Sequence, residues 1–124
     1  MPVADASVPD IHPIGGASVD NLRLKPTKAA LNPPGISALK APSPAQAASG
    51  IRAAYPDATE LHVAAKIVGS ASVESIRSAG FDVIPDPSRG QPNHHRIIHP
   101  DGLAGFTDEN LGRLAEVFTN TTGN

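Results

Sequence analysis

Three of the five histidines in the chain lie close together, as His94, His95 and His99. An imidazole titrates near neutral pH, so it can act as a general acid or base, bind a metal ion or pair with an anion. Asn93 and Arg96 belong to the same stretch, and the fork of an arginine suits phosphate and carboxylate oxygens. Residues of this kind at this density make the stretch the strongest candidate for a functional site.

The spacing of the histidines argues against a simple metal site. The apolar residues and the proline within this stretch favour extended chain over helix. On a strand, His95 and His99 share a face but lie about 13 Å apart at ~3.3 Å per residue. One ion with bonds of about 2 Å cannot reach both. A metal would need other ligands, such as Asp82 or Asp86, and we assign no metal ligands.

Strand alternation divides the stretch between two faces, with His94 and Arg96 on one and His95 and His99 on the other. One face must pack on the helices, so a single histidine here is equally well explained as a buried residue bonded to loop carbonyls. We take His94 and His95 as candidate catalytic residues. Asn93 and Arg96 are candidate contacts to an anionic ligand or cofactor.

A serine that follows a stiff loop is the second candidate. The sequence Pro33-Pro34-Gly35-Ile36-Ser37 places a hydroxyl at the start of a predicted strand. There it could bind a sugar or phosphate oxygen, or it could satisfy the backbone of a turn. No Gly-x-Ser-x-Gly elbow surrounds it, which speaks against a hydrolase triad. We take Ser37 as a candidate for both catalysis and cofactor binding.

Arg23 is the third candidate and lies on a short strand predicted at residues 22–24. Pro26, which cannot donate to a strand ladder, would end that strand. The guanidinium is then either solvated or directed into a cleft, where it could pair with a phosphate through two hydrogen bonds. We expect Arg23, Ser37 and residues 93–96 to share one wet groove, because a small core cannot bury them unpaired.

Two helices are predicted in the middle of the chain. Ser43-Pro44-Ala45-Gln46 combines an N-cap, a proline in the first turn and a capping-box glutamine, which predicts a helix over residues 43–55. A similar start at Asp57 predicts a second helix to Val68, ended by Gly69. Alternation of the apolar residues 61–67 fits a strand as well.

The C-terminal half alternates helices and strands. A helix is predicted over residues 72–79, ended by Gly80 in a left-handed conformation. Strands are expected at 36–39, 81–84 and 95–99, with a loop over 86–92 and a turn over 100–102. Thr107 should cap a last helix whose apolar stripe would pack on Val83 and Ile84; the stripe consists of Leu111, Leu114, Ala115 and Phe118.

Composition sets further bounds on structure and function. At 124 residues the chain is one domain in length, and with 3% aromatic residues its core must be built from Ala, Val, Ile and Leu. Thirteen prolines and eleven glycines indicate many loops. The net charge of −2 without a basic run disfavours binding to bulk nucleic acid. No segment has the length and apolarity of a membrane span.

The N-terminal residues 1–21 lack helical or strand periodicity and contain three prolines and a glycine pair. We predict a flexible arm there, with His12 as an arm residue, followed by a single α+β domain over residues 22–124. His62 is predicted to lie on the surface. The absence of a basic start and an apolar stretch predicts that the chain carries no Sec signal peptide.

Three parts of the sequence occur in the order expected of one known family. They are Asn21-Leu22-Arg23-Leu24, then Gly35-Ile36-Ser37-Ala38-Leu39, and then residues 82–86 and 93–100 with the closing helix at Leu111 and Leu114. They resemble an arginine-bearing first strand, a strand with glycine and serine, and a C-terminal block in which a His-containing strand ends at proline. The family is the ADP-ribosyltransferase-like toxins delivered by bacterial type VI secretion systems, and the likeness extends over roughly a third of the chain.

The resemblance implies an ADP-ribosyltransferase-like fold and NAD as cofactor. It implies that Arg23 contacts a dinucleotide phosphate, that Ser37 contacts the nicotinamide ribose, and that His94 or His95 lines the same cleft. It also implies a cognate immunity protein or antitoxin as partner. The expected location is the bacterial cytoplasm, or a target cell reached by a secretion route without a Sec signal.

Three functions therefore compete. The first is an ADP-ribosyltransferase-like toxin that uses NAD. The second is an RNase-type toxin in which two histidines act as general base and acid on an RNA phosphate. The third is a binding or scaffold domain without chemistry, a role that the richness in proline and glycine would suit.

Overall fold

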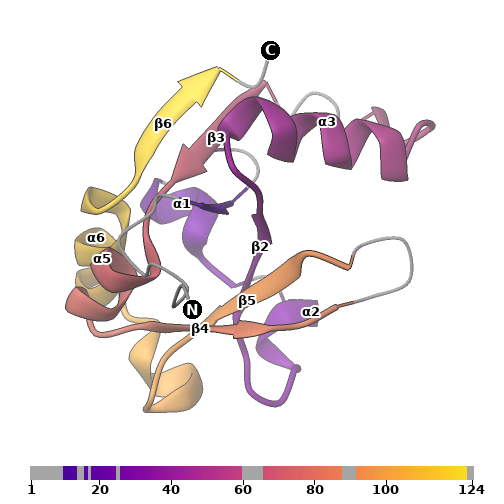
Figure 1. The fold of residues 1–124 in the computed structure, drawn as a ribbon. Helices are drawn as coiled ribbons and strands as arrows, with labels where there is room; N and C mark the ends of the chain where they lie inside the picture. Colours follow the sequence, from indigo (N-terminus) through magenta and orange to yellow (C-terminus); the bar gives the residue numbers. More distant parts are fainter. Residues whose placement is uncertain are drawn as a thin grey trace, which may run out of the picture.

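The structure is a computed structural model that describes residues 10–13, 16, 18–24, 26–59, 66–87 and 92–122. Within these ranges, helices surround short antiparallel strands, which confirms the predicted α+β class (Figure 1). The elements are β1 (Ile11–His12), α1 (Val19–Leu22), α2 (Pro26–Ala29), β2 (Ile36–Lys40), α3 (Pro44–Ala54), β3 (Ile67–Ser70), α5 (Val73–Ser78), β4 (Asp82–Pro85), β5 (His94–Ile98), the 3-10 turn η1 (Gly102–Gly105), α6 (Asp108–Glu116) and β6 (Thr119–Thr122). None of the helices in these ranges is long and apolar enough to cross a membrane.

The strands form two antiparallel sheets that meet at β1. The larger sheet has the order β1-β2-β5-β4, and β3 pairs with β6 in the smaller one. Ile11 in β1 exchanges two backbone hydrogen bonds of 3.0 Å with Ala71, which directly follows β3. A strand of two residues therefore pairs with β2 on one side and continues into the smaller sheet on the other.

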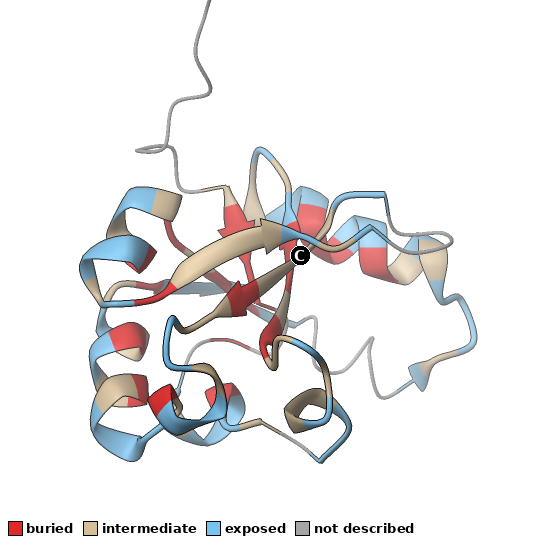
Figure 2. Cartoon of the chain, turned by 90° about the horizontal axis from the view of Figure 1, so that it is seen from below, coloured by how far each residue is buried: buried red, intermediate tan, exposed pale blue. Residues whose placement is uncertain are grey.

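Two apolar clusters fill the space between the sheets and the helices, and Figure 2 shows the buried positions on the inward sides of strands and helices. As the composition predicts, aliphatic residues and alanine dominate both clusters, with two phenylalanines added. The larger cluster consists of Ile11, Leu22, Ile36, Ala38, Ala71, Ile76, Phe81, Ile97, Leu111, Leu114 and Phe118. The smaller one lies under α3 and consists of Leu39, Ala47, Ala48, Ile51 and Val68.

The helix starts predicted from the caps Ser43 and Thr107 are confirmed, and Ser72 caps the third helix in the same way. The hydroxyls of Ser43, Ser72 and Thr107 each accept a hydrogen bond from the backbone N–H three residues later, at the starts of α3, α5 and α6. Gly80 follows α5 with a φ of +92°, the left-handed conformation expected of it. A cap acts within one turn of chain, which explains why these boundaries can be read from sequence.

The last helix buries the stripe that its spacing predicts. Leu111, Leu114 and Phe118 belong to the larger cluster, and Val83 of β4 packs against that same cluster. Helix α6 also lies alongside α1, whose Leu22 is fully buried. The stripe is therefore a core element, as expected, with α1 as an additional neighbour. The predicted contact with Ile84 is wrong, because Ile84 lies opposite Arg96 on the other face of the sheet.

The predicted flexible arm is wrong for part of residues 1–21. Ile11 and His12 are fully buried in β1, and Val19–Leu22 forms α1. A strand of two residues is too short for alternation to show, and its partners lie far away in sequence. Residues 1–9, 14, 15 and 17 of this segment lie outside the described part of the chain.

Two further predictions of secondary structure are wrong. Leu22 ends a helix instead of beginning a strand, because Ser18 caps that helix by accepting a hydrogen bond from the Asn21 N–H. Residues 67 and 68, predicted to be the end of the second helix, form part of β3 instead, in agreement with the apolar alternation. His62 and the other residues of the range 60–65 lie outside the described part of the chain.

Leu114→Ala should lower the free energy of unfolding by about 2–5 kcal/mol, because α6 loses a fully buried side chain. Leu103→Ala removes the same atoms from a side chain that is 55% exposed, so it should change stability by less than about 0.5 kcal/mol. Urea denaturation measures both. Equal transition midpoints for the two variants would show that α6 lies outside the cooperative core.

Ile11→Ala should be about as costly as Leu114→Ala, about 2–5 kcal/mol, because Ile11 is fully buried where the two sheets meet. Ile67→Ala provides the matched control, since Ile67 is 44% exposed. Thermal unfolding followed by circular dichroism measures the difference, and 1 kcal/mol shifts the midpoint by about 4–8 °C in a domain of this size. An unchanged midpoint for Ile11→Ala would restore the flexible-arm prediction.

Candidate functional site

Cross-strand register places four polar side chains on one face of the larger sheet. Ser37 of β2 lies opposite Arg96 of β5, and the Asp86 N–H donates to His94 O at 2.9 Å, which extends the β4 ladder by one residue. Side chains that oppose each other across an antiparallel pair share a face, as do residues two apart on one strand. We call Ser37, Asp86, His94 and Arg96 the polar row.

The opposite face of β2 and β5 contributes to the core. Ile36, Ala38 and Ile97 alternate with the polar row and are buried in the larger cluster. The predicted division of β5 into two faces is therefore confirmed, and it is the face of Ile97 that packs inward. Burial of that face leaves the polar row on the side of the sheet that the larger cluster does not occupy.

Arg96 is more enclosed than His94 or Asp86, with only 12% of its side chain exposed. Its Nη1 donates to Pro33 O at 2.8 Å, and its Nη2 donates to Asp86 Oδ2 at 2.9 Å. Its Nε is buried and has no hydrogen-bond partner among the residues that the structure describes. The guanidinium thus links the loop before β2 to the end of β4, and of its three nitrogens only Nε makes no hydrogen bond to the described residues.

Gly35 makes room for the Arg96 side chain. A Cβ at this position would lie 2.7 Å from Arg96 Cδ and 2.7 Å from Ile97 O. Real Cβ atoms essentially never approach other atoms this closely. The glycine that the sequence places before the strand is therefore needed for close packing against Arg96.

His94 is held in one orientation through Nδ1. This nitrogen lies 2.9 Å from the backbone O of Asp86 and 3.3 Å from its Oδ2. Both oxygens only accept, so Nδ1 carries the proton and the neutral ring presents its lone pair at Nε2. His94 can then take up a proton at Nε2 while Asp86 fixes the ring, the arrangement of a general base and its orienting group.

His95 belongs to the other face of β5, next to Ala38 in register. Its Nδ1 donates to Asn93 O at 2.8 Å, a local contact with the residue two positions earlier in the chain. The prediction that residues 93–96 line one groove together is wrong for His95, because successive strand residues point to opposite faces. Asn93 is exposed at the start of β5, where its carbonyl also accepts from the Lys40 N–H at 3.0 Å.

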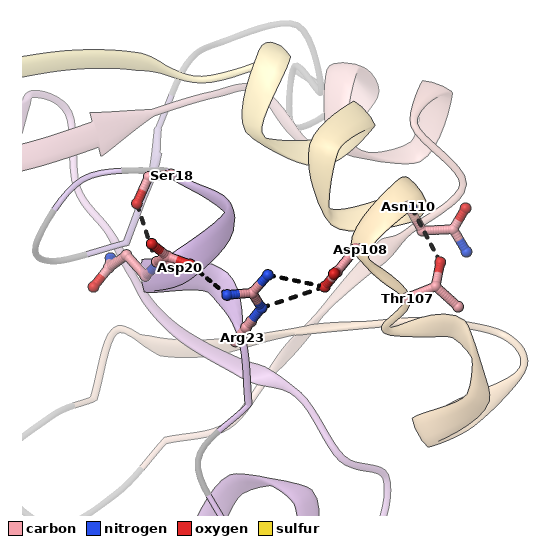
Figure 3. Close-up of polar contacts among 7 residues, drawn as sticks. Ser18, Asp20, Arg23, Thr107, Asp108 and Asn110 are labelled. Carbon is pink, nitrogen blue, oxygen red and sulfur yellow. Dashed lines mark hydrogen bonds and ion pairs between the residues drawn. The ribbon is translucent and has the colours of Figure 1, made fainter.

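Arg23 points toward two carboxylates instead of the polar row (Figure 3). It follows α1 directly, where it pairs with Asp20, and its Nη2 lies 3.2 Å from Oδ1 of Asp108 at the start of α6. Half of the Arg23 side chain is exposed. The structure therefore brings Ser37 and Arg96 together as predicted, but it assigns Arg23 to the contact between α1 and α6.

Two histidines of the chain have structural roles. His12 is fully buried: its Nε2 donates to Ala41 O at 2.8 Å, and its Nδ1 lies 2.9 Å from Ser70 Oγ. His99 packs edge-on against Phe81 with ring centroids 4.9 Å apart. The sequence alone gives no sign of the His12 contacts, because its partners are 29 and 58 residues away.

Asp82, one of the two carboxylates considered for a metal, pairs with Arg77 at 2.9 Å. Burial alone would raise the pKa of Asp82, but hydrogen bonds from Arg77 and from the Val83 N–H, together with the charge of Arg77, hold the pKa below its ordinary value of 3.8. Asp86 binds Arg96, as described above. Among the described residues, no three His, Cys, Asp or Glu side chains are grouped so that they could hold a metal ion.

Gly35→Ala should destabilise the chain by about 1–3 kcal/mol, because the added methyl group overlaps Arg96 and the β5 backbone. Gly50→Ala is the matched control: a Cβ there meets nothing within 4 Å, and the residue lies inside α3. That change should stabilise the chain by about 0.5–1 kcal/mol. Opposite shifts of the urea midpoint are expected, and a neutral Gly35→Ala would contradict the close contact.

Known proteins give no direct guide to this arrangement. Comparison of the chain with protein-family models, with curated proteins and with solved structures finds no match.

Proposed function

We propose that the chain is a bacterial toxin domain that uses NAD for ADP-ribosyl transfer, and that the polar row is its reactive site. The proposal includes an ADP-ribosyltransferase-like fold and a cognate immunity protein or antitoxin that neutralises the domain. Two of the three stretches that resemble this toxin family, residues 35–39 and 93–100, contain β2 and β5. Their pairing supports the proposal because it places Ser37 opposite Arg96.

The orientation of His94 is the observation that carries the proposal. In ADP-ribosyl transfer the bond between ribose C1′ and nicotinamide breaks, nicotinamide leaves, and an acceptor nucleophile bonds to C1′. The acceptor loses a proton, which Nε2 of His94 can accept because Nδ1 is committed to Asp86. None of the strands in the described ranges contains a glutamate, and the proposal gives this step to the imidazole of His94.

The remaining members of the polar row suit the anionic part of a dinucleotide. Arg96 supplies the positive charge, and the Ser37 hydroxyl next to it can bond a ribose or phosphate oxygen. The phosphate contact that the resemblance assigned to Arg23 passes to Arg96, since Arg23 is paired with Asp20 and Asp108. Asn93, which is exposed directly before His94, remains a candidate contact for the same ligand.

His94→Gln should lower the rate of ADP-ribosyl transfer about 10²- to 10⁴-fold, the contribution typical of a general base. The assay follows transfer of label from NAD to protein or nucleic acid in a bacterial lysate. His95→Gln should reduce the rate far less, because that ring lies on the other face. Arg113→Gln, at an exposed ion pair on α6, should match the wild type.

The toxicity of the same variants in bacteria should follow their transfer activity. Induced expression in bacteria should stop growth for the wild type and for Arg113→Gln but not for His94→Gln. A neighbouring reading frame that encodes the immunity protein should restore growth. Absence of any NAD consumption by a toxic wild-type chain would overturn the transferase proposal.

An RNase-type toxin is the second candidate, because an oriented imidazole also serves as base toward an RNA 2′-hydroxyl. The placement of His94 and His95 on opposite faces weighs against the two acting on one phosphate. RNA fragments with cyclic phosphate ends would identify this activity. Growth unaffected by the wild-type chain would favour the third function, a binding domain.

A further inference from the structure

One side of the Arg96 guanidinium, formed by Nε and Nη2, makes a hydrogen bond within the described part of the chain through Nη2 only. In arginine, the Nε–H and one Nη2–H point in the same direction and together match two oxygens of an anion. Asp86 accepts from Nη2 through a single oxygen, Oδ2, while Nε is buried and donates to none of the described residues. Nη1 is committed elsewhere, to Pro33 O.

Asp86 is poorly suited to fill the whole edge. The carboxylate accepts from Arg96 through Oδ2 alone, and this same oxygen also lies 3.3 Å from Nδ1 of His94, so its position is shared between two positively polarised groups. A buried donor without a partner loses its bonds to water and regains nothing. An anion with several oxygens at this position would satisfy Nε and Nη2 together.

The neighbouring groups point to phosphate as that anion. Ser37 lies opposite Arg96 on the same face, where its hydroxyl can donate to a third oxygen. The Asp86 side chain is 33% exposed, compared with 12% for Arg96, so the carboxylate can move into water while the guanidinium stays in place. Gly35 and Pro33 hold the stem and the far edge of Arg96.

We propose that Asp86 is a displaceable occupant of a phosphate site on Arg96. In the bound state a phosphate group accepts from Nε, from Nη2 and from the Ser37 hydroxyl, and the Asp86 carboxylate moves away from the edge. The site follows from the geometry of the polar row. The inference rests on the proposed function only in placing the ligand on this face, and it does not depend on the transfer reaction.

Calorimetric titration with inorganic pyrophosphate tests the proposal without any turnover. Asp86→Asn removes the competing charge but keeps the side-chain shape and the backbone bond to His94, so the Kd should fall about tenfold. Arg96→Lys keeps the positive charge but lacks the fork, so the Kd should rise about tenfold or more. Asp108→Asn and Arg113→Lys make the same changes at exposed pairs and should leave the Kd unchanged.

A second measurement covers the case in which a variant folds poorly. The Nε–H signal of Arg96, assigned by its loss in Arg96→Lys, should shift during titration of the wild type with pyrophosphate. Two further titrations distinguish the sources of the phosphate group. If a nucleotide supplies it, Asp86→Asn should lower the Kd for ADP; if a free anion does, Asp86→Asn should lower the Kd for inorganic phosphate. Either result supports the site.

Weaker or equal pyrophosphate binding by Asp86→Asn would overturn the inference, as would a stationary Arg96 signal. The outcome is separable from that of the proposed function. A chain that binds pyrophosphate in this manner but leaves NAD intact would keep the phosphate site and lose the transferase. A chain that consumes NAD with no effect of Asp86→Asn would do the reverse.

Discussion

His12 is buried completely, yet its ring is bonded at both nitrogens to segments outside its own strand. Nε2 reaches the chain just after β2, at Ala41, and Nδ1 reaches β3 at Ser70. Next to it, Ile11 pairs with Ala71 and places its side chain in the larger cluster. The position of β2 relative to β3 therefore depends on two residues that lie far from both in sequence. Because β2 carries Ser37 and pairs with β5, the geometry of the polar row depends on the same contacts.

The polar row shows how a thin core can support a site. Ile36, Ala38 and Ile97 fix β2 and β5 from the core side. On the other side the aliphatic stem of Arg96 packs against Gly35, and its guanidinium reaches Pro33 and Asp86. An arginine in this position both stabilises the loop before β2 and supplies the charge of the site. Loss of its charge would therefore affect the fold and the ligand contact together.

Local signals could be read from the sequence, and long-range ones could not. The caps at Ser43, Ser72 and Thr107 act within one turn, and the stripe of α6 repeats over two turns, so both were predictable. The strands β2, β4 and β5 were predicted from apolar runs bounded by proline and glycine. The two-residue β1 and the four-residue α1 offer no period to detect, and both depend on distant partners.

In the candidate site, too, the local features were predictable from the sequence and the long-range contacts were not. Ser37, His94 and Arg96 could be named from residue type and strand alternation, and the register confirms that they share a face. The pairing of Asp86 with Arg96 and His94 depends on how β4 ends against β5, which no sequence pattern specifies. Arg23 was misplaced because Ser18 caps a helix at a position where the leucines suggested a strand. Residue types thus indicated the chemistry, and the pairing of strands determined which residues share it.

The outer strand of the larger sheet has a consequence for behaviour at high concentration. An edge strand exposes unpaired backbone groups, and a second copy of the chain can add to it as a further strand. In β4 this edge is only four residues long, ends at Pro85, which has no N–H, and begins at Asp82, whose ion pair with Arg77 places charge beside it. These features are the ones that natural sheets use against edge-to-edge association. The open edge of the larger sheet is therefore a poor template for a second copy of the chain.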